Sequence, residues 1–108
     1  MIHSLKILPQ YFADVISGEK TFEIRVYDRP YHKGDLLALN EYDADRKCYT
    51  GNSCLVYIDY ILNDAEYVKK NMLVMSIKPC SVYRHDTPCR PEKLLTKDYS
   101  VPLATKGD

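Results

Sequence analysis

Short stretches in which apolar and polar residues alternate recur along the first 77 residues, and they constrain the fold more than any other feature. The clearest is residues 21–27, where Phe22, Ile24 and Val26 share one side and polar or charged residues share the other. This period of two is that of a β-strand. We therefore expect a half-buried strand with an apolar face and a charged face.

Four further segments have the pattern of strands, namely residues 2–8, 36–42, 53–62 and 72–77. One helix is predicted over Pro9–Ser17, because proline is tolerated in a first helical turn and Gly18 suits the left-handed residue that ends a helix. Residues 65–70 have the composition of a single helical turn. The fold class expected is α+β, mainly β, and 108 residues suffice for one domain only.

Charge and hydropathy exclude several classes of protein. Fifteen Lys and Arg residues balance fifteen Asp and Glu residues, so the chain is not a polycation that coats nucleic acid. Any anion site must be local. The apolar runs are too short for a membrane span, and the first residues lack a secretory leader pattern. We expect a cytoplasmic protein that does not bind membranes.

The cysteines and histidines do not have the spacing of metal ligands. Cys48, Cys54, Cys80 and Cys89 contain no pair separated by two to four residues, which structural zinc sites usually need. We therefore expect no metal, no other cofactor, and free thiols.

The character of the chain changes near its end. From Pro79 onward, prolines recur and the apolar period is lost. The pattern predicts a folded domain over residues 1–79 and an extended tail over residues 80–108.

One charged stretch stands apart, and it runs from Gly18 to Arg25. The strand period puts Glu23 and Arg25 on one face, and Lys20 approaches that face from the turn after the helix. In a functional interpretation, Arg25 offers a planar fork to phosphate or a base edge and Lys20 a point charge. Glu23 would then position Arg25 or accept a hydrogen bond from a base amino group. The alternative is a solvated strand face with an ordinary ion pair.

Tyrosines give a second, independent hint. Tyr27, Tyr31, Tyr42 and Tyr49 fall near the predicted site or its loops, and bases stack on such rings. The alternative is that these rings pack within the sheet, where tyrosine is common.

The spacing of Gly18, Lys20, Glu23 and Arg25 resembles the GxKxxExR signature of the ASCH domain, a PUA-like β-barrel. Residues 5–12, the Gly34-Asp35 turn and residues 49–51 are similar to small bacterial and phage ASCH-like proteins of uncharacterised function. The resemblance covers residues 1–79. It implies a barrel of about five to six strands with the first helix packed at its mouth, and a cleft there lined by Lys20 and Arg25.

Three functions follow from this resemblance and from the residues. The first is a nucleic-acid-binding module, for RNA or a nucleotide, that uses Gly18, Lys20, Glu23, Arg25 and Tyr27. The second is an amidohydrolase acting on N-acetylated cytidine or a related nucleoside, since some ASCH-like proteins are such enzymes. In those enzymes the Lys activates a Thr nucleophile, whereas Glu23 occupies that position in this chain. Lys20 and Glu23 would then be catalytic, with Glu66 as a candidate later acid. The third is an accessory domain that contacts other proteins.

Overall fold

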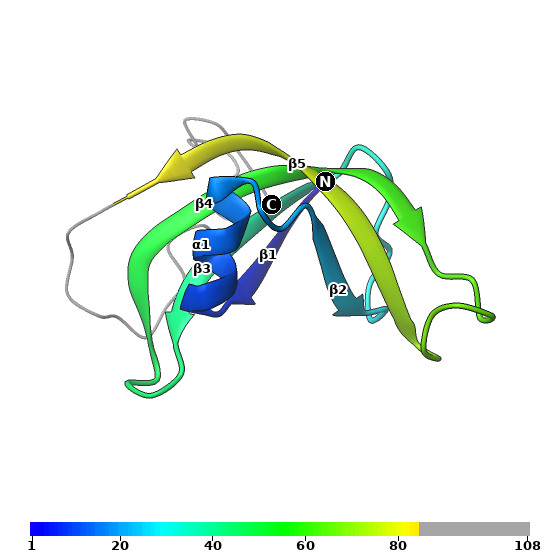
Figure 1. Cartoon of the computed structure of the whole chain (residues 1–108), viewed down its shortest axis with the longest axis horizontal. Helices are drawn as coiled ribbons and strands as arrows, with labels where there is room; N and C mark the ends of the chain where they lie inside the picture. Colours follow the sequence, from blue (N-terminus) through cyan, green and yellow to red (C-terminus); the bar gives the residue numbers. More distant parts are fainter. Residues whose placement is uncertain (85–108) are drawn as a thin grey trace.

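The structure is a computed structural model, and it describes residues 1–84. These residues form five strands and one helix (Figure 1). In chain order the elements are β1 (Ile2–Ile7), α1 (Pro9–Ser17), β2 (Phe22–Val26), β3 (Leu36–Asp43), β4 (Cys48–Leu62) and β5 (Met72–Tyr83). The prediction of a mainly β fold is confirmed, and so are the predicted bounds of the helix. Residues 65–67 form a turn in which the N–H of Val68 donates to Asp64 O at 2.9 Å, the spacing of one helical turn, and no longer helix forms there.

All five strands belong to one sheet, in the order β1-β3-β4-β5-β2. β1 pairs with β3 in parallel, and the other neighbouring strands pair antiparallel. The sheet curls, so that β1 and β2, its two edges, lie beneath the arch of β4 and β5 (Figure 1). The expected barrel is therefore present in the coarser form of a curled five-stranded half-barrel.

The apolar core fills the concave side of this half-barrel. Its centre is made of side chains from β3, β4 and β5, which are almost fully buried: Leu37, Leu39, Val56, Ile58, Leu73 and Met75. Phe12 and Val15 of α1 belong to the same cluster. Their spacing of three residues puts both on one face of the helix, and this face packs onto the sheet.

β5 is longer than the sequence pattern predicts. It continues through Pro79 to Tyr83, which pairs with Ser53 of β4. Pro79 lies where the β4–β5 register shifts, and the registered pairs of β2 with β5 end at Ser76. A missing N–H breaks no ladder bond at such a place. The predicted loss of regular structure after Pro79 is therefore wrong for residues 80–83, while residues 85–108 of the predicted tail lie outside the described residues.

The start of the chain is fixed by Asp35, which precedes β3. One carboxylate oxygen lies 3.2 Å from the N-terminal ammonium of Met1. The other lies 2.8 Å from His3 Nε2 and accepts a hydrogen bond of 2.9 Å from the backbone N–H of His32. Burial alone would raise the pKa of Asp35, but these hydrogen bonds and the ammonium outweigh it and lower the pKa below its usual 3.8.

Three further expectations concern membranes, metals and thiols. No helix within residues 1–84 is long and apolar enough to cross a membrane. In the same part of the chain, no group of three or more His, Cys, Asp and Glu side chains is placed to hold a metal ion. Cys54 and Cys80 are free thiols, whereas Cys48 is disulfide-bonded, which corrects the expectation that it is free.

Candidate functional site

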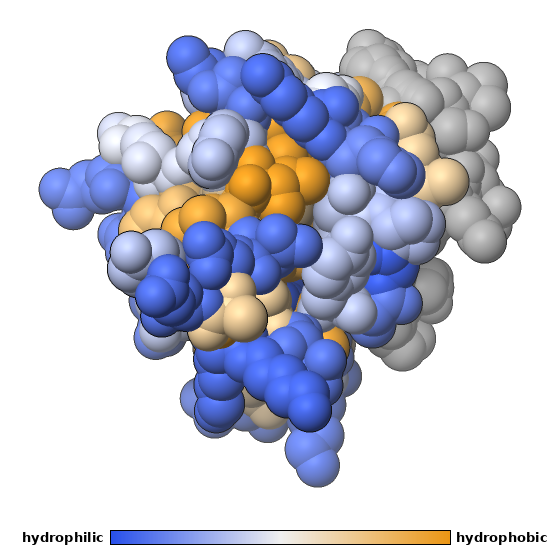
Figure 2. Space-filling view, turned by 90° about the vertical axis from the view of Figure 1, so that its right-hand side faces the viewer, coloured by the Kyte–Doolittle hydropathy of each residue, from blue (hydrophilic) through white to orange (hydrophobic). Residues whose placement is uncertain are grey.

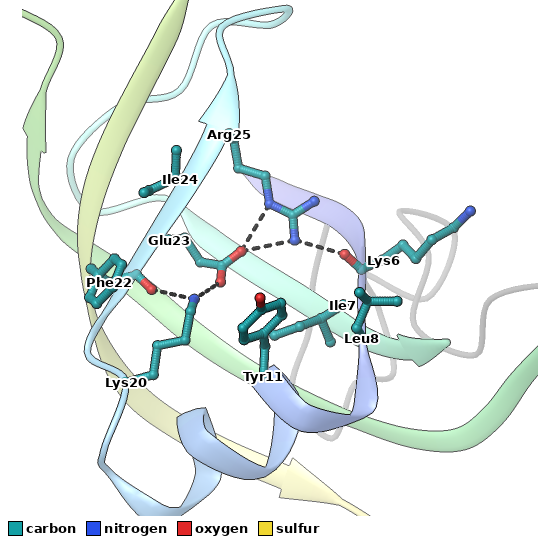
Figure 3. Close-up of a pocket in the computed structure, with 9 residues that line it drawn as sticks. All are labelled: Lys6, Ile7, Leu8, Tyr11, Lys20, Phe22, Glu23, Ile24 and Arg25. Atoms are coloured by element: carbon teal, nitrogen blue, oxygen red, sulfur yellow. Dashed lines mark hydrogen bonds and ion pairs between the residues drawn. The ribbon is translucent and has the colours of Figure 1, made fainter. Parts of the chain in front are cut away.

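An open cleft of about 460 Å³ lies between β1, the start of α1 and β2 (Figure 3). It is lined by Lys6, Ile7, Leu8, Tyr11, Lys20, Phe22, Glu23, Ile24 and Arg25. The predicted trio of Lys20, Glu23 and Arg25 therefore lies on one wall of a single cleft, as the strand period indicated.

Lys20 is placed by the way the helix ends. Gly18 adopts a left-handed conformation, with φ of 88°, and its N–H donates to Val15 O. The chain then turns back, and the N–H of Lys20 donates to Asp14 O at 2.9 Å. Gly18 thus contributes backbone geometry, and it does not line the cleft. Lys20 enters the site from the C-terminal end of α1, where unpaired carbonyls favour a cation.

Glu23 is the centre of the charged group. Its side chain is 5% exposed, and Oε1 accepts a hydrogen bond from Lys20 Nζ, which also donates to Phe22 O at 2.6 Å. Oε2 accepts a hydrogen bond of 2.9 Å from Arg25 Nε. The buried carboxylate is thus held by two cations, as Figure 3 shows.

The facing of β2 is the reverse of the expected one. Glu23 is 4% exposed, whereas the apolar residues Phe22, Ile24 and Val26 are 43%, 53% and 54% exposed. Alternation shows that the two faces of a strand differ, but it does not show which face is buried. The inner face of β2 lines the cleft, where Glu23 is paired with Lys20 and Arg25 donates to the backbone of β1. The outer face leaves its apolar side chains exposed, and apolar side chains are visible on one side of the molecule in Figure 2.

Arg25 links the two edges of the half-barrel. Its Nη2 donates to Lys6 O of β1 at 2.7 Å. This side-chain hydrogen bond joins β2 to β1. The Nη1 group makes no hydrogen bond within residues 1–84, so two N–H donors of the guanidinium stay available to a ligand.

β2 also presents unpaired backbone groups to the cleft. Tyr27 N–H donates to Asn71 O at 2.8 Å, and the alternation of an antiparallel ladder then directs the backbone groups of Glu23 and Arg25 toward β5. The N–H and C=O of Ile24 point the other way, and neither has a partner in the described part of the chain. One donor and one acceptor therefore lie side by side on the cleft wall.

Two aromatic side chains line the cleft, Phe22 and Tyr11. Tyr11 is not among the four tyrosines that the sequence predicted near the site. Lys20 Nζ lies 5.7 Å from the centroid of its ring. Tyr11 lies in the first turn of α1 and is not on the buried face of that helix, and this position was the signal that could have identified it.

The four selected tyrosines lie elsewhere. Tyr31 and Tyr49 are buried in the body of the protein, and Tyr42 stacks edge-on against Tyr49 at 4.9 Å. Burial raises the pKa of Tyr31 and of Tyr49. These three rings pack within the fold, which is the alternative interpretation, and Tyr31 also lines a hollow next to the cleft. Tyr27 is 46% exposed and lies in a separate hollow at the far end of β2.

The candidate acid Glu66 is not in the cleft. It is exposed in the connection between β4 and β5, where its N–H donates to Asp64 Oδ1 at 2.8 Å. Thr21, the hydroxyl residue nearest to the motif's charged trio in sequence, is exposed and does not line the cleft either.

A buried thiol lies close to the charged group. Burial, together with the nearby Glu23 carboxylate, raises the pKa of Cys54 to about 12. Thiolates are the reactive form, so Cys54 is a core residue and no nucleophile for this cleft.

Comparison with known proteins gives two findings. An uncharacterised 12.9 kDa protein in the GpA 3′ region of Escherichia phage P2 is 44% identical over 41 residues, and the match spans 38% of this chain and 38% of the phage protein. The model of the family described as a domain of unknown function, DUF3850, matches residues 2–77, which include every element that lines the cleft. Because this match covers well over half of the 108 residues, the chain belongs to the DUF3850 family.

Proposed function

We propose that the chain is a nucleic-acid-binding module, with single-stranded RNA or a nucleotide in the cleft, and that its half-barrel is an ASCH-like member of the PUA-like folds. The observation that carries the proposal is the buried Glu23, which holds Lys20 and Arg25 at the wall of an open cleft. Packing alone does not favour such a group, because apolar residues of similar volume usually stabilise a fold at least as well as buried ion pairs.

The groups that face the cleft match the chemistry of a nucleotide. The free Nη1 donors of Arg25 suit a phosphate or a base edge. The adjacent N–H and C=O of Ile24 complement the acceptor and donor on the edge of a nucleobase. Tyr11 supplies an aromatic surface. Single strands fit better than a duplex, because their bases are free to enter a cleft of this size.

The test is binding of labelled single-stranded RNA, followed by fluorescence anisotropy over a range of salt concentrations. Lys20→Ala and Arg25→Ala should each weaken binding and reduce the slope of log Kd against log salt by about 0.7 per lost phosphate contact. Lys33→Ala removes an exposed positive charge outside the cleft and is the control for a general loss of charge. Equal affinity of all four proteins, with unchanged circular dichroism, would overturn the proposal.

A second variant tests whether the backbone N–H of Ile24 donates a hydrogen bond to a nucleobase. Ile24→Pro removes the N–H that points into the cleft and leaves the bonds of β2 to β5 in place, since proline is tolerated on an edge strand. It should weaken RNA binding about three- to tenfold, as expected for one lost hydrogen bond. Ile24→Ala keeps the N–H and should bind like wild type. Equal affinity of the proline and alanine variants would show that this N–H contacts no ligand.

The amidohydrolase alternative has less support from the geometry. Both oxygens of Glu23 are engaged by cations, and neither Thr21 nor Glu66 lines the cleft. Incubation of the same preparations with N-acetylated cytidine tests for amidohydrolase activity. Turnover by wild type that is lost in Lys20→Ala would make the hydrolase the better account.

A further inference from the structure

Two further hollows continue from the cleft along β2. The first, of about 420 Å³, shares Lys6, Ile24 and Arg25 with the cleft and extends to Arg29. The second, of about 440 Å³, shares Met72 with the first and is lined by Tyr27 and by the connection between β4 and β5. The cleft and these two hollows therefore follow one another along the whole strand, which spans about 16 Å.

The charge of this path differs from that of the rest of the molecule. Residues 1–84 contain eleven basic and eleven acidic residues. The cleft and the two hollows are lined by six of the basic residues and by only two of the acidic ones. The six basic residues are Lys6, Lys20, Arg25, Arg29, Lys69 and Lys70. Both acidic residues are paired, Glu23 with Lys20 and Arg25, and Asp28 with Arg29 at 3.5 Å. A neutral chain thus concentrates positive charge beside one strand.

The second hollow has both kinds of side chain that bind single-stranded nucleic acids, namely positive charges and an exposed aromatic ring. Lys69 and Lys70 are exposed, and neither makes an ion pair with any residue of the described chain. Tyr27 is 46% exposed beside them, and its N–H is tied to Asn71 O at 2.8 Å. The nearby acidic residues of this connection, Asp64 and Glu66, do not line the hollow.

We propose that the cleft and the two hollows form one track for a single-stranded nucleic acid several nucleotides long. One nucleotide occupies the cleft, the phosphates that follow pass Arg29, and the strand ends against Lys69 and Lys70 with a base on the ring of Tyr27. The inference rests on the proposed function and deepens it, because it assigns a polymer, rather than a free nucleoside, as the ligand. Positive grooves with stacking aromatics are the usual means of holding single strands.

Oligonucleotide length separates the track from the cleft. The probes are fluorescein-labelled single-stranded RNAs from about two to about eight nucleotides long. For the longest probe, the double variant Lys69→Gln, Lys70→Gln should weaken binding about tenfold and lower the salt slope by about 0.7 per lost contact. For the shortest probe, the affinity of this double variant should equal that of wild type. Tyr27→Ala should show the same dependence on length with an unchanged salt slope.

The matched control is Arg46→Gln, Lys47→Gln, which removes two adjacent charges at the turn between β3 and β4, outside the track. It should bind both probes like wild type. If the two double variants lose affinity for the longest RNA equally, or not at all, while Lys20→Ala binds weakly, the track is overturned and the proposed function stands. If Lys20→Ala and Arg25→Ala bind every probe like wild type, the proposed function itself fails. Thermal unfolding of each variant shows that it is folded.

Discussion

At the scale of single residues, Glu23 determines the character of the cleft. Its carboxylate is almost fully buried and is the shared acceptor for Lys20 and Arg25. Without it, two cations would face each other at the edge of an apolar core. The motif is therefore a structural unit as well as a candidate ligand site, and its three side chains cannot be treated as independent.

We predict that Glu23→Gln lowers the free energy of unfolding by about 3 kcal/mol, because it leaves two partly buried cations without their counter-charge. Urea unfolding measures this loss. Glu19→Gln removes an exposed carboxylate four residues earlier and should change the free energy of unfolding by less than about 0.5 kcal/mol. Equal midpoints for the two variants would mean that the charged group does not stabilise the fold.

At the scale of elements, the helix and the presence of each strand were predictable, because they depend on local features. Pro9 and Gly18 fix the ends of α1, and period-two alternation marks the strands. Which face of β2 is buried was not predictable, since alternation does not show which side of a strand packs on the core. The long-range pairing of β1 with β3, which leaves β2 on an edge, decides that question.

The candidate site was predictable in part for the same reason. Lys20, Glu23 and Arg25 lie within six residues, so local geometry brings them together. The contribution of Lys6 O depends on how the sheet curls, and no local pattern carries that information. Tyr11, by contrast, lies off the apolar face of the predicted helix, and that local pattern could have identified it. The end of β5 was missed because a proline normally interrupts a strand, whereas Pro79 lies at a bulge.

The length of β5 gives a prediction at this scale. A chain ending at Lys78 lacks the pairs that Ser81, Val82 and Tyr83 make with β4, and it loses the packing of Tyr83 against Leu55. Its free energy of unfolding should be about 1 kcal/mol lower than that of a chain ending at Arg84, in keeping with one large side chain that is partly buried. Urea unfolding in reducing buffer keeps Cys48 in the same state in both chains. Indistinguishable midpoints would show that residues 79–84 do not stabilise the sheet.

At the scale of the whole molecule, polar side chains join both ends of β1 to other parts of the half-barrel. Near the end of β1, Arg25 reaches Lys6 O from β2. At its start, Asp35 joins the N-terminal ammonium, His3 and the backbone of His32. The second of these ties depends on pH through Asp35, whose pKa is lowered in the folded state.

A lowered folded-state pKa stabilises the protein above the unfolded value and loses this effect as the pH falls through the folded value. Asp35→Asn removes a carboxylate that accepts several hydrogen bonds, so it should reduce the free energy of unfolding near neutral pH by about 1.5 to 3 kcal/mol. The difference from wild type should shrink as the pH falls below 3.8, because the pKa of Asp35 is lowered in the folded state. Urea unfolding at a series of pH values, on protein that begins at Met1 without an added tag, measures the difference. A gap that stays constant down to the most acidic pH would assign the effect to something other than this carboxylate.

The inward direction of Glu23 and Arg25 also bears on how the protein behaves at high concentration. A five-residue edge strand with exposed apolar side chains and open backbone groups is a template for pairing with another chain. Arg25 points inward from this edge and keeps two N–H donors without a partner in residues 1–84, so a docked strand would bury them at a cost. We therefore expect that a substitution that removes the charge of Arg25 also favours aggregation through β2.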